Sequence, residues 1–297
     1  MKSYKAHIAL IAANLFFGIN YPVAKSLMPD FLHPIEIIIL RAGISSILFW
    51  IIQHFFFYEK TDKGDILKLA LCGLFGVSIN QLLFFEGLNL STPIDASIIM
   101  VSNPVMVLII ASLLIKEKIT SLKMIGIVLG GAGALITIVY GKELSSGSDP
   151  LKGNIFLFIN ALSYSVYLVM VKPLMTKYNP FTVMKWTFFF GFIFILPFTS
   201  GAFTNVNWSV FSGFTWSALV YVVIATTFLA YLLNAFSMKY VNPSVASIYI
   251  YFQPVIASLL AMLMYDDRIT IVKIFSALLI FTGVYLVTKK PLVKRSA

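Results

Sequence analysis

The sequence predicts an all-α integral membrane protein with ten transmembrane helices. Of its 297 residues, 59% are hydrophobic and 11% are charged, whereas about 25% of the residues of a soluble domain are charged. The hydrophobic residues lie in runs of about 20, the length of helix that crosses a bilayer. The second half of the chain also repeats part of the first. Lipid, rather than water around a globular core, is therefore the expected solvent for this composition.

Ten apolar runs with short connections define the expected helices, and several connections contain Pro or Gly, which end helices. The expected spans are residues 7–26, 35–57, 67–88, 94–115, 124–140, 154–172, 181–199, 215–236, 244–264 and 274–288. The first run is expected to be a retained helix, because it shows no small-residue cleavage site of a signal peptide. The longest polar connection, residues 141–153, separates an expected five-helix unit, 1–140, from a second, 154–297.

The positions of the basic residues predict the orientation. The net charge of +10 comes from Lys and Arg that lie mainly between apolar runs, which favours membrane-loop asymmetry over nucleic-acid binding. With the N-terminus inside the cell, 16 of the 22 Lys and Arg residues fall on the cytoplasmic side. An even number of spans then puts both termini inside. We expect a multi-pass protein of the cell membrane (the inner membrane in a bacterium), with the 141–153 loop outside.

Two segments of the chain match each other in a single register. Shifted by 150 residues, Leu83 to Gly133 overlays Leu233 to Gly283. The matches include Pro93 with Pro243, Ala96-Ser97-Ile98 with Ala246-Ser247-Ile248, and Pro104-Val105 with Pro254-Val255. Because each copy would contain five spans, an odd number, the second copy must be inverted relative to the first. Many secondary transporters have such repeats, with the substrate site near mid-membrane between them.

Several motifs occur along the chain in a characteristic order. They are the first helix from Asn14 to Lys25, Arg41 seven residues after Pro34, the run from Pro104 to Lys118, and Asn160-Ala-Leu-Ser-Tyr164. In order, spacing and duplication they resemble EamA-type permeases of the drug/metabolite transporter superfamily. The resemblance covers nearly the whole chain. It implies ten helices in an inverted repeat and the export or exchange of amino acids or related metabolites.

The chain departs from this family pattern at two places. Phe17 stands where Trp is usual, and Asp266-Asp267-Arg268 stands where the family has a pair led by Glu.

Asn103 and Gln253 are the leading candidates for a substrate site. They are repeat equivalents, and each is followed by a proline. A proline within a helix leaves the carbonyl four residues earlier without its usual partner. A polar amide beside that break could bind a substrate in a cavity, and a helix–helix hydrogen bond is the alternative. We expect both amides to face one shared central cavity.

Other polar residues share single faces of their predicted helices, as the helical period requires. These candidates are Asn14 and Tyr21 on the first helix, Asn80 on the third, Asn160 and Tyr164 on the sixth, Tyr231 and Asn234 on the eighth, and Tyr249 on the ninth. Asn20 is expected to point away from the first-helix face. Each candidate could line a pathway or join two helices.

The ionisable residues within the spans bear on energy coupling. Lys25, Arg41 and Glu86 lie near the predicted outer ends of their helices and are candidates for coupling or gating. No carboxylate falls at a predicted midplane, where proton-coupled carriers commonly place one. We therefore expect facilitated movement down the substrate gradient, with Glu86 as the acid closest to a pathway.

The sequence supports an enzymatic or channel function less well than a transporter function. An intramembrane enzyme would need a catalytic constellation, but His7, His33 and His54 all fall at span ends. The lone Cys72 excludes a disulfide framework and a Cys-based metal site within one chain. No phosphate-binding loop and no potassium-filter motif is present. We expect no catalytic residue, cofactor or metal; the partners would be a small-molecule substrate and the bilayer, and a monomer is compatible with the sequence.

Within transporters, a nucleotide-sugar or sugar-phosphate antiporter is the alternative from the same superfamily. Phosphates call for several Lys or Arg deep in the cavity, whereas Lys25, Arg41 and Lys185 are only partly intramembrane and none is predicted to be central. The sequence therefore predicts a permease for a neutral or zwitterionic metabolite that works by alternating access. The family resemblance implies that the metabolite is an amino acid or related compound and that it is exported.

Overall fold

The computed structural model describes residues 2–115, 121–144, 147–241, 243–265 and 269–288. Within these ranges every regular element is helical. The first half contains α1 (Lys2–Lys25), α2 (Pro34–Phe56), η1 (Lys63–Asp65), α3 (Ile66–Gly73), η2 (Leu74–Ser78), α4 (Ile79–Leu90), α5 (Pro93–Met100), α6 (Asn103–Ile115) and α7 (Ser121–Leu144). The second contains α8 (Pro150–Lys177), α9 (Pro180–Ile195), η3 (Leu196–Phe198), η4 (Trp208–Val210), α10 (Gly213–Val220), η5 (Tyr221–Leu229), α11 (Ala230–Met238), α12 (Pro243–Ile248), η6 (Tyr249–Tyr251), α13 (Phe252–Met264) and α14 (Ile271–Thr288).

The helices have the length and hydropathy of membrane spans. In the described ranges, eight helical stretches can cross a bilayer, and α7 and α14 contain two shorter apolar segments, Met124–Gly133 and Ile271–Gly283. Large apolar side chains such as Leu263 and Ile271 lie exposed on the outside of the bundle. The chain is thus a multi-pass, all-helical membrane protein.

Helix starts follow local capping chemistry. Proline occupies the first turn of α2, α5, α8 and α9, where its missing N–H costs no hydrogen bond. Thr92, Asp149 and Asn179 accept a backbone N–H at the starts of α5, α8 and α9.

The expected 141–153 linker is partly helical. The helix α7 runs on to Leu144 and α8 already begins at Pro150. A helix that has formed extends into a polar segment without a new nucleation cost. The connection is therefore shorter than expected.

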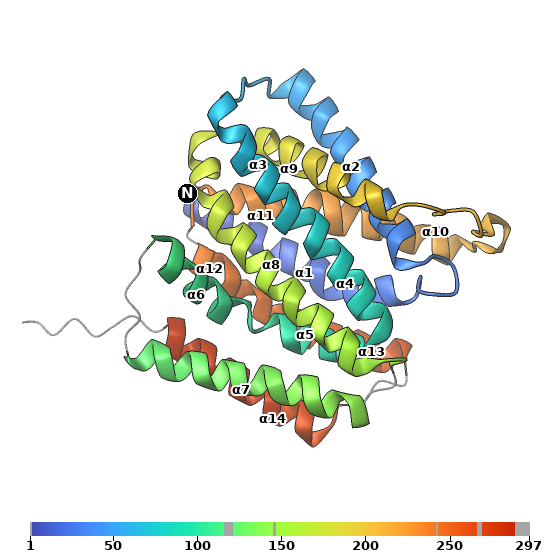
Figure 1. Cartoon of the computed structure of the whole chain (residues 1–297), viewed down its shortest axis with the longest axis vertical. Helices are drawn as coiled ribbons and strands as arrows, with labels where there is room; N and C mark the ends of the chain where they lie inside the picture. Colours follow the sequence, from blue (N-terminus) through green and yellow to red (C-terminus); the bar gives the residue numbers. More distant parts are fainter. Residues whose placement is uncertain (1, 116–120, 145–146, 242, 266–268, 289–297) are drawn as a thin grey trace, which may run out of the picture.

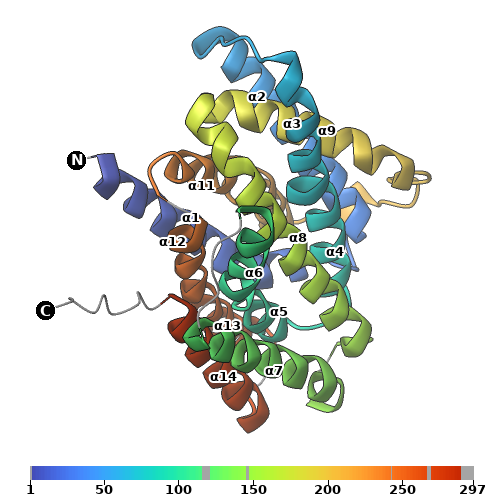
Figure 2. The same ribbon diagram turned by 60° about the vertical axis from the view of Figure 1, so that its left-hand side comes forward.

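The two halves of the chain interlock. The first-half helix α1 packs against α11 and α13, whereas the second-half helix α8 packs against α4 and α6. The pair α7 and α14 lies side by side along one edge of the bundle, and α2, α3 and α9 gather toward the opposite edge (Figures 1 and 2). As a result, α1 and α8 lie at the centre, where each is surrounded by helices of the other half.

Two equivalent spans contain a π-helical segment. These segments, η2 and η5, separate α3 from α4 and α10 from α11. A π-helical turn changes the direction of the side chains that follow it and is common at functional sites. Here the residues that follow, on α4 and α11, line the central cavity described next.

Candidate functional site

A central cavity lies between the two halves. The space between its lining atoms, including the part open to solvent, is about 660 Å³. Helices α1, α2, α4, α5, α8, α11, α12 and α13 and the short η6 all contribute to the wall. The lining residues are Asn14, Phe17, Asn20, Tyr21, Arg41, Asn80, Gln81, Phe84, Phe85, Met100, Asn160, Tyr164, Leu168, Tyr231, Asn234, Ala246, Ser247, Ile250 and Gln253.

One wall is a buried hydrogen-bond chain between α1 and α13. Gln253 donates its amide to Asn14 Oδ1 at 2.7 Å and accepts from the Tyr21 hydroxyl at 2.8 Å. Asn14 in turn donates to the carbonyl of Leu10 at 2.8 Å. The structure thus brings Asn14, Tyr21 and Gln253, all three of them candidates from the sequence, together at the cavity.

A second part of the wall joins α4, α8 and α11. The Tyr231 hydroxyl donates to Asn80 Oδ1 at 2.9 Å, and Asn160 donates to the backbone carbonyl of Asn80 at 2.6 Å. Asn234 donates to the Tyr164 hydroxyl at 2.5 Å. The side-chain oxygens of Asn160 and Asn234 have no hydrogen-bond partner in the described chain. These two oxygens are buried polar atoms beside the cavity.

Arg41 also lines the cavity, contrary to the expectation that it is not central. Its side chain is buried, with the guanidinium carbon 4.5 Å from the centre of the Phe85 ring. The cavity extends far enough toward the first turns of α2 to include it. Its position in the sequence indicated only that Arg41 lies near a helix end, and could not show how far the cavity extends.

Asn103 differs from the prediction, because it does not belong to the cavity lining. Its amide donates to the carbonyl of Met100 at 2.8 Å, which is the carbonyl that Pro104 leaves without a backbone donor. Its oxygen accepts from Ser165 Oγ at 2.8 Å. Asn103 is thus fully used in closing the helix break and joining α6 to α8, which is the alternative role considered above.

Three further candidates lie outside the lining. The Tyr249 hydroxyl is hydrogen-bonded to His7 Nδ1 at 2.7 Å. Lys25 donates to the carbonyls of Leu88, Asn89 and Ser91 at the end of α4. Glu86 is half-buried on α4.

By contrast, Asn20 does line the cavity, although it was expected to point elsewhere. Its side-chain oxygen accepts a hydrogen bond from Thr226 at 3.0 Å.

Sequence reasoning missed the aromatic part of the wall. Phe17 packs edge-on against Tyr231, and Phe84 packs against Tyr21. Helical spacing could have indicated both: Phe17 lies three residues after Asn14, and Phe84 four residues after Asn80, on the same helix faces. In a chain so rich in Phe, the sequence does not distinguish these rings from those that face lipid.

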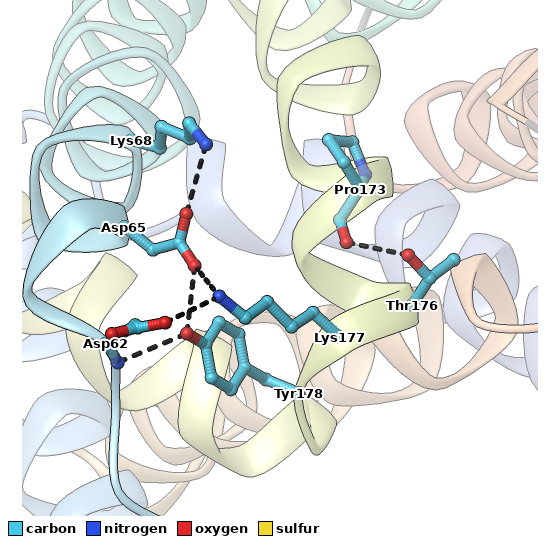
Figure 3. Close-up of polar contacts among 7 residues, drawn as sticks. All are labelled: Asp62, Asp65, Lys68, Pro173, Thr176, Lys177 and Tyr178. Atoms are coloured by element: carbon cyan, nitrogen blue, oxygen red, sulfur yellow. Dashed lines mark hydrogen bonds and ion pairs between the residues drawn. The ribbon is translucent and has the colours of Figure 1, made fainter.

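Two ionic contacts lie away from the cavity. Asp95 on α5 is fully buried and pairs with Lys273 on α14 across 3.3 Å. Near the end of α8, Asp65 accepts from Lys177 at 2.6 Å, from Tyr178 at 2.9 Å and from Lys68 at 3.0 Å (Figure 3). Both contacts tie a first-half segment to a second-half helix.

Among the residues that the structure covers, no group of three His, Cys, Asp or Glu side chains could hold a metal ion. The motifs at Glu117-Lys118 and Asp266-Asp267-Arg268 lie outside the described residues.

Comparison with known proteins gives the family. The model of the EamA-like transporter family matches the chain twice, at residues 4–139 and 151–289. The chain belongs to the EamA-like transporter family. The resemblance inferred from the first helix and the repeat is thereby confirmed.

Several relatives of this EamA-family chain are named as transporters. An uncharacterized transporter of Archaeoglobus fulgidus is 25% identical over 96% of this chain and 99% of its own length. The uncharacterized transporter YetK of Bacillus subtilis is 24% identical, covering 97% of this chain and 88% of its own. A WAT1-related protein of Arabidopsis thaliana is 23% identical, and the match covers 95% of this chain and 85% of that protein.

A solved crystal structure has the same fold, with a TM-score of 0.67 and 18% sequence identity, and covers 95% of this chain and 96% of that chain. That likeness concerns the fold; the family match and the names of the relatives show that the chain is a transporter.

Proposed function

We propose that this EamA-family transporter moves a small neutral or zwitterionic metabolite, an amino acid or a related compound, by alternating access of the central cavity. The observation that carries the proposal is a single cavity walled by both halves of the chain and lined by amides, phenols and aromatic rings. Amides and phenols can hydrogen-bond both ends of a zwitterion, and the rings suit an apolar side chain.

A phosphate-bearing substrate fits this cavity less well. A nucleotide sugar carries two phosphate charges, for which several Lys or Arg would be expected. Among the lining residues Arg41 is the one that carries a charge. An intramembrane enzyme is likewise disfavoured, because the relatives are named as transporters.

The proposed architecture is a pair of inverted five-helix repeats, residues 1–140 and 154–297, with ten spans in all. The double match of the family model supports two copies. The exchange of central helices, with α1 packed on α11 and α13 and α8 packed on α4 and α6, is what a two-fold axis in the membrane plane would produce.

A pair of lysine contacts supports the same symmetry. Lys25 on α1 donates to the carbonyls of Leu88 and Ser91, at the end of α4. Lys172 on α8 donates to the carbonyls of Met238 and Val241, 150 residues further along, at the end of α11. In each half, the first helix thus caps the end of the third span.

We further propose that the protein lies in the cell membrane with both termini in the cytoplasm and exports its substrate. The excess of Lys and Arg in the cytoplasmic connections supports this orientation. Export is what the family resemblance implies.

A binding screen followed by a transport assay tests the proposal. Purified protein in detergent is heated with each proteinogenic amino acid, and a bound ligand should raise the melting temperature. The compounds that bind should then show counterflow in liposomes containing the protein and none in empty liposomes. Absence of both a thermal shift and counterflow for every amino acid would contradict the proposed substrate class.

A further inference from the structure

Arg41 is exceptional among the cations embedded in the described spans. Lys25 and Lys172 donate to backbone carbonyls, Lys185 donates to Gln53 at 3.0 Å, and Lys273 pairs with Asp95. Arg41 is 3% exposed, yet its Nε and Nη1 atoms have no hydrogen-bond partner in the described chain. A cation kept only for structure would be expected to have such partners, because a buried unpaired charge is costly.

The contacts of Arg41 leave two of its donor atoms, Nε and Nη1, without a partner. The guanidinium carbon stands 4.5 Å from the centre of the Phe85 ring, and such a contact uses the flat face of the guanidinium. The N–H groups lie in the guanidinium plane, so stacking does not satisfy them. Arg41 lines the cavity, but its Nε and Nη1 atoms are covered in this structure, so a ligand would meet them after the guanidinium turns toward the cavity.

The charge of the cavity wall points to an anionic group. No Asp or Glu occurs among the lining residues. An ammonium group would therefore meet only neutral acceptors, such as the partnerless oxygens of Asn160 and Asn234. A carboxylate would meet a full positive charge in a fork geometry that carboxylates match with two hydrogen bonds.

We propose that Arg41 binds the carboxylate of the transported solute, so that a free carboxylate is required for recognition and an amino group is optional. This assignment rests on the proposed function and names the substrate chemistry of the same cavity. It predicts that organic monocarboxylates bind as well as amino acids of the same shape. Cations and amides of that shape are rejected.

The test uses four compounds that share one aromatic body and differ in their polar groups. They are 3-phenylpropanoate, phenylalanine, phenylalaninamide and phenethylamine. Leucine, 4-methylpentanoate and leucinamide form a second series with an aliphatic body. Binding to the purified protein is followed by the shift in melting temperature, and transport by counterflow in liposomes. In both series the carboxylates should bind at millimolar concentration or below, and the amides and amines should not.

Two substitutions of Arg41 and one control separate recognition from folding. Arg41→Gln should weaken carboxylate binding about 30-fold or more, because it removes one partner of a buried charged contact. Arg41→Lys keeps the charge but lacks the fork, and should bind with intermediate affinity. Lys185→Gln is the matched control: it removes a buried cation that does not line the cavity, and should leave the preference for carboxylate over amide unchanged.

The stability of the unliganded protein gives an independent readout. Arg41→Gln should melt at the same temperature as the wild type or higher, because an unpaired buried charge is removed. A purely structural Arg41 would give the opposite result, a lower melting temperature with unchanged ligand preference.

The assignment is overturned if amides or amines bind as tightly as carboxylates, if Arg41→Gln keeps the carboxylate preference, or if no carboxylate binds. Counterflow without carboxylate preference would remove the role of Arg41 but leave the transport function intact. Binding of carboxylates through Arg41 without counterflow would keep the anion site and remove the transport function.

Discussion

Asn103 and Gln253 occupy equivalent places in the repeat and yet have different surroundings. Asn103 reaches back three residues to the Met100 carbonyl that Pro104 leaves without a partner. The longer Gln253 side chain instead extends across to α1, where Asn14 and Tyr21 hold both ends of its amide. Gln253 has one more methylene than Asn103 and a different neighbouring helix. Asn103 therefore caps a helix break, whereas Gln253 forms part of the cavity wall.

This contrast predicts opposite outcomes for alanine substitutions. Asn103→Ala should lower the stability of the protein by about 1–3 kcal/mol, because it leaves a buried carbonyl without a donor, and should not change ligand affinity. Gln253→Ala should weaken binding of the ligand found in the amino-acid screen about tenfold, a loss of roughly 1.4 kcal/mol. Melting temperatures with and without ligand measure both effects. A loss of affinity in Asn103→Ala equal to that in Gln253→Ala would contradict the assignment of Asn103 to packing.

At the scale of the helices, close packing depends on glycine at a few crossings. A Cβ at Gly283 of α14 would lie 2.5 Å from the Gly126 carbonyl oxygen and 2.5 Å from the Gly130 nitrogen of α7. These are backbone atoms, so no side chain can move aside to make room. Small residues of this kind let membrane helices approach closely where burial in lipid gives no driving force.

Gly283→Ala should therefore separate α7 from α14 and lower stability by about 1–3 kcal/mol. Gly131→Ala is the matched control on α7, because a Cβ there meets nothing within 4 Å. The control should melt at the wild-type temperature or slightly above, since Ala favours helix more than Gly does. Equal melting temperatures for the two variants in the same detergent would show that this crossing does not need glycine.

At the scale of the whole molecule, the orientation can be tested with two exposed positions. Ser148 and Tyr58 are exposed on connections at opposite ends of the bundle. In a Cys72→Ala background, an impermeant thiol reagent applied to intact cells should label Ser148→Cys. Tyr58→Cys should be labelled only after the membrane is opened. The reverse pattern would show that the termini lie outside.

A second property of the whole molecule is whether transport is coupled to protons. The lining residues include no carboxylate. The buried acid Asp95 is paired with Lys273, and Glu86 lies outside the lining. Amides and phenols do not titrate near neutral pH, so transport should be facilitated rather than proton-driven. In liposomes, Glu86→Gln should retain counterflow, and a pH gradient alone should not concentrate substrate. Uphill accumulation that depends on the pH gradient and is lost in Glu86→Gln would contradict this mechanism.

The sequence by itself determined the class of the protein, the approximate helices and the family. Hydropathy is a property of consecutive residues, so apolar runs long enough to cross a bilayer can be recognised without knowing what packs beside them. The same holds for the repeat that aligns Pro104 with Pro254, and for the polar faces that contain Asn14, Asn80 and Asn160. All three of these asparagines line the cavity.

Only the tertiary structure decided which polar groups meet at the cavity and which are used elsewhere. The distance of a residue from the end of its helix predicted that Arg41 lies near the outer end of α2, and equivalence in the repeat predicted that Asn103 and Gln253 face one shared cavity. The structure places Arg41 in the lining and Asn103 outside it. The partner of a buried polar side chain depends on which helix lies opposite, and that neighbour comes from the other half of the chain. Asn103 meets Ser165 of α8, and Gln253 meets Asn14 of α1. Contacts of this kind join residues far apart in sequence, so no local pattern can specify them.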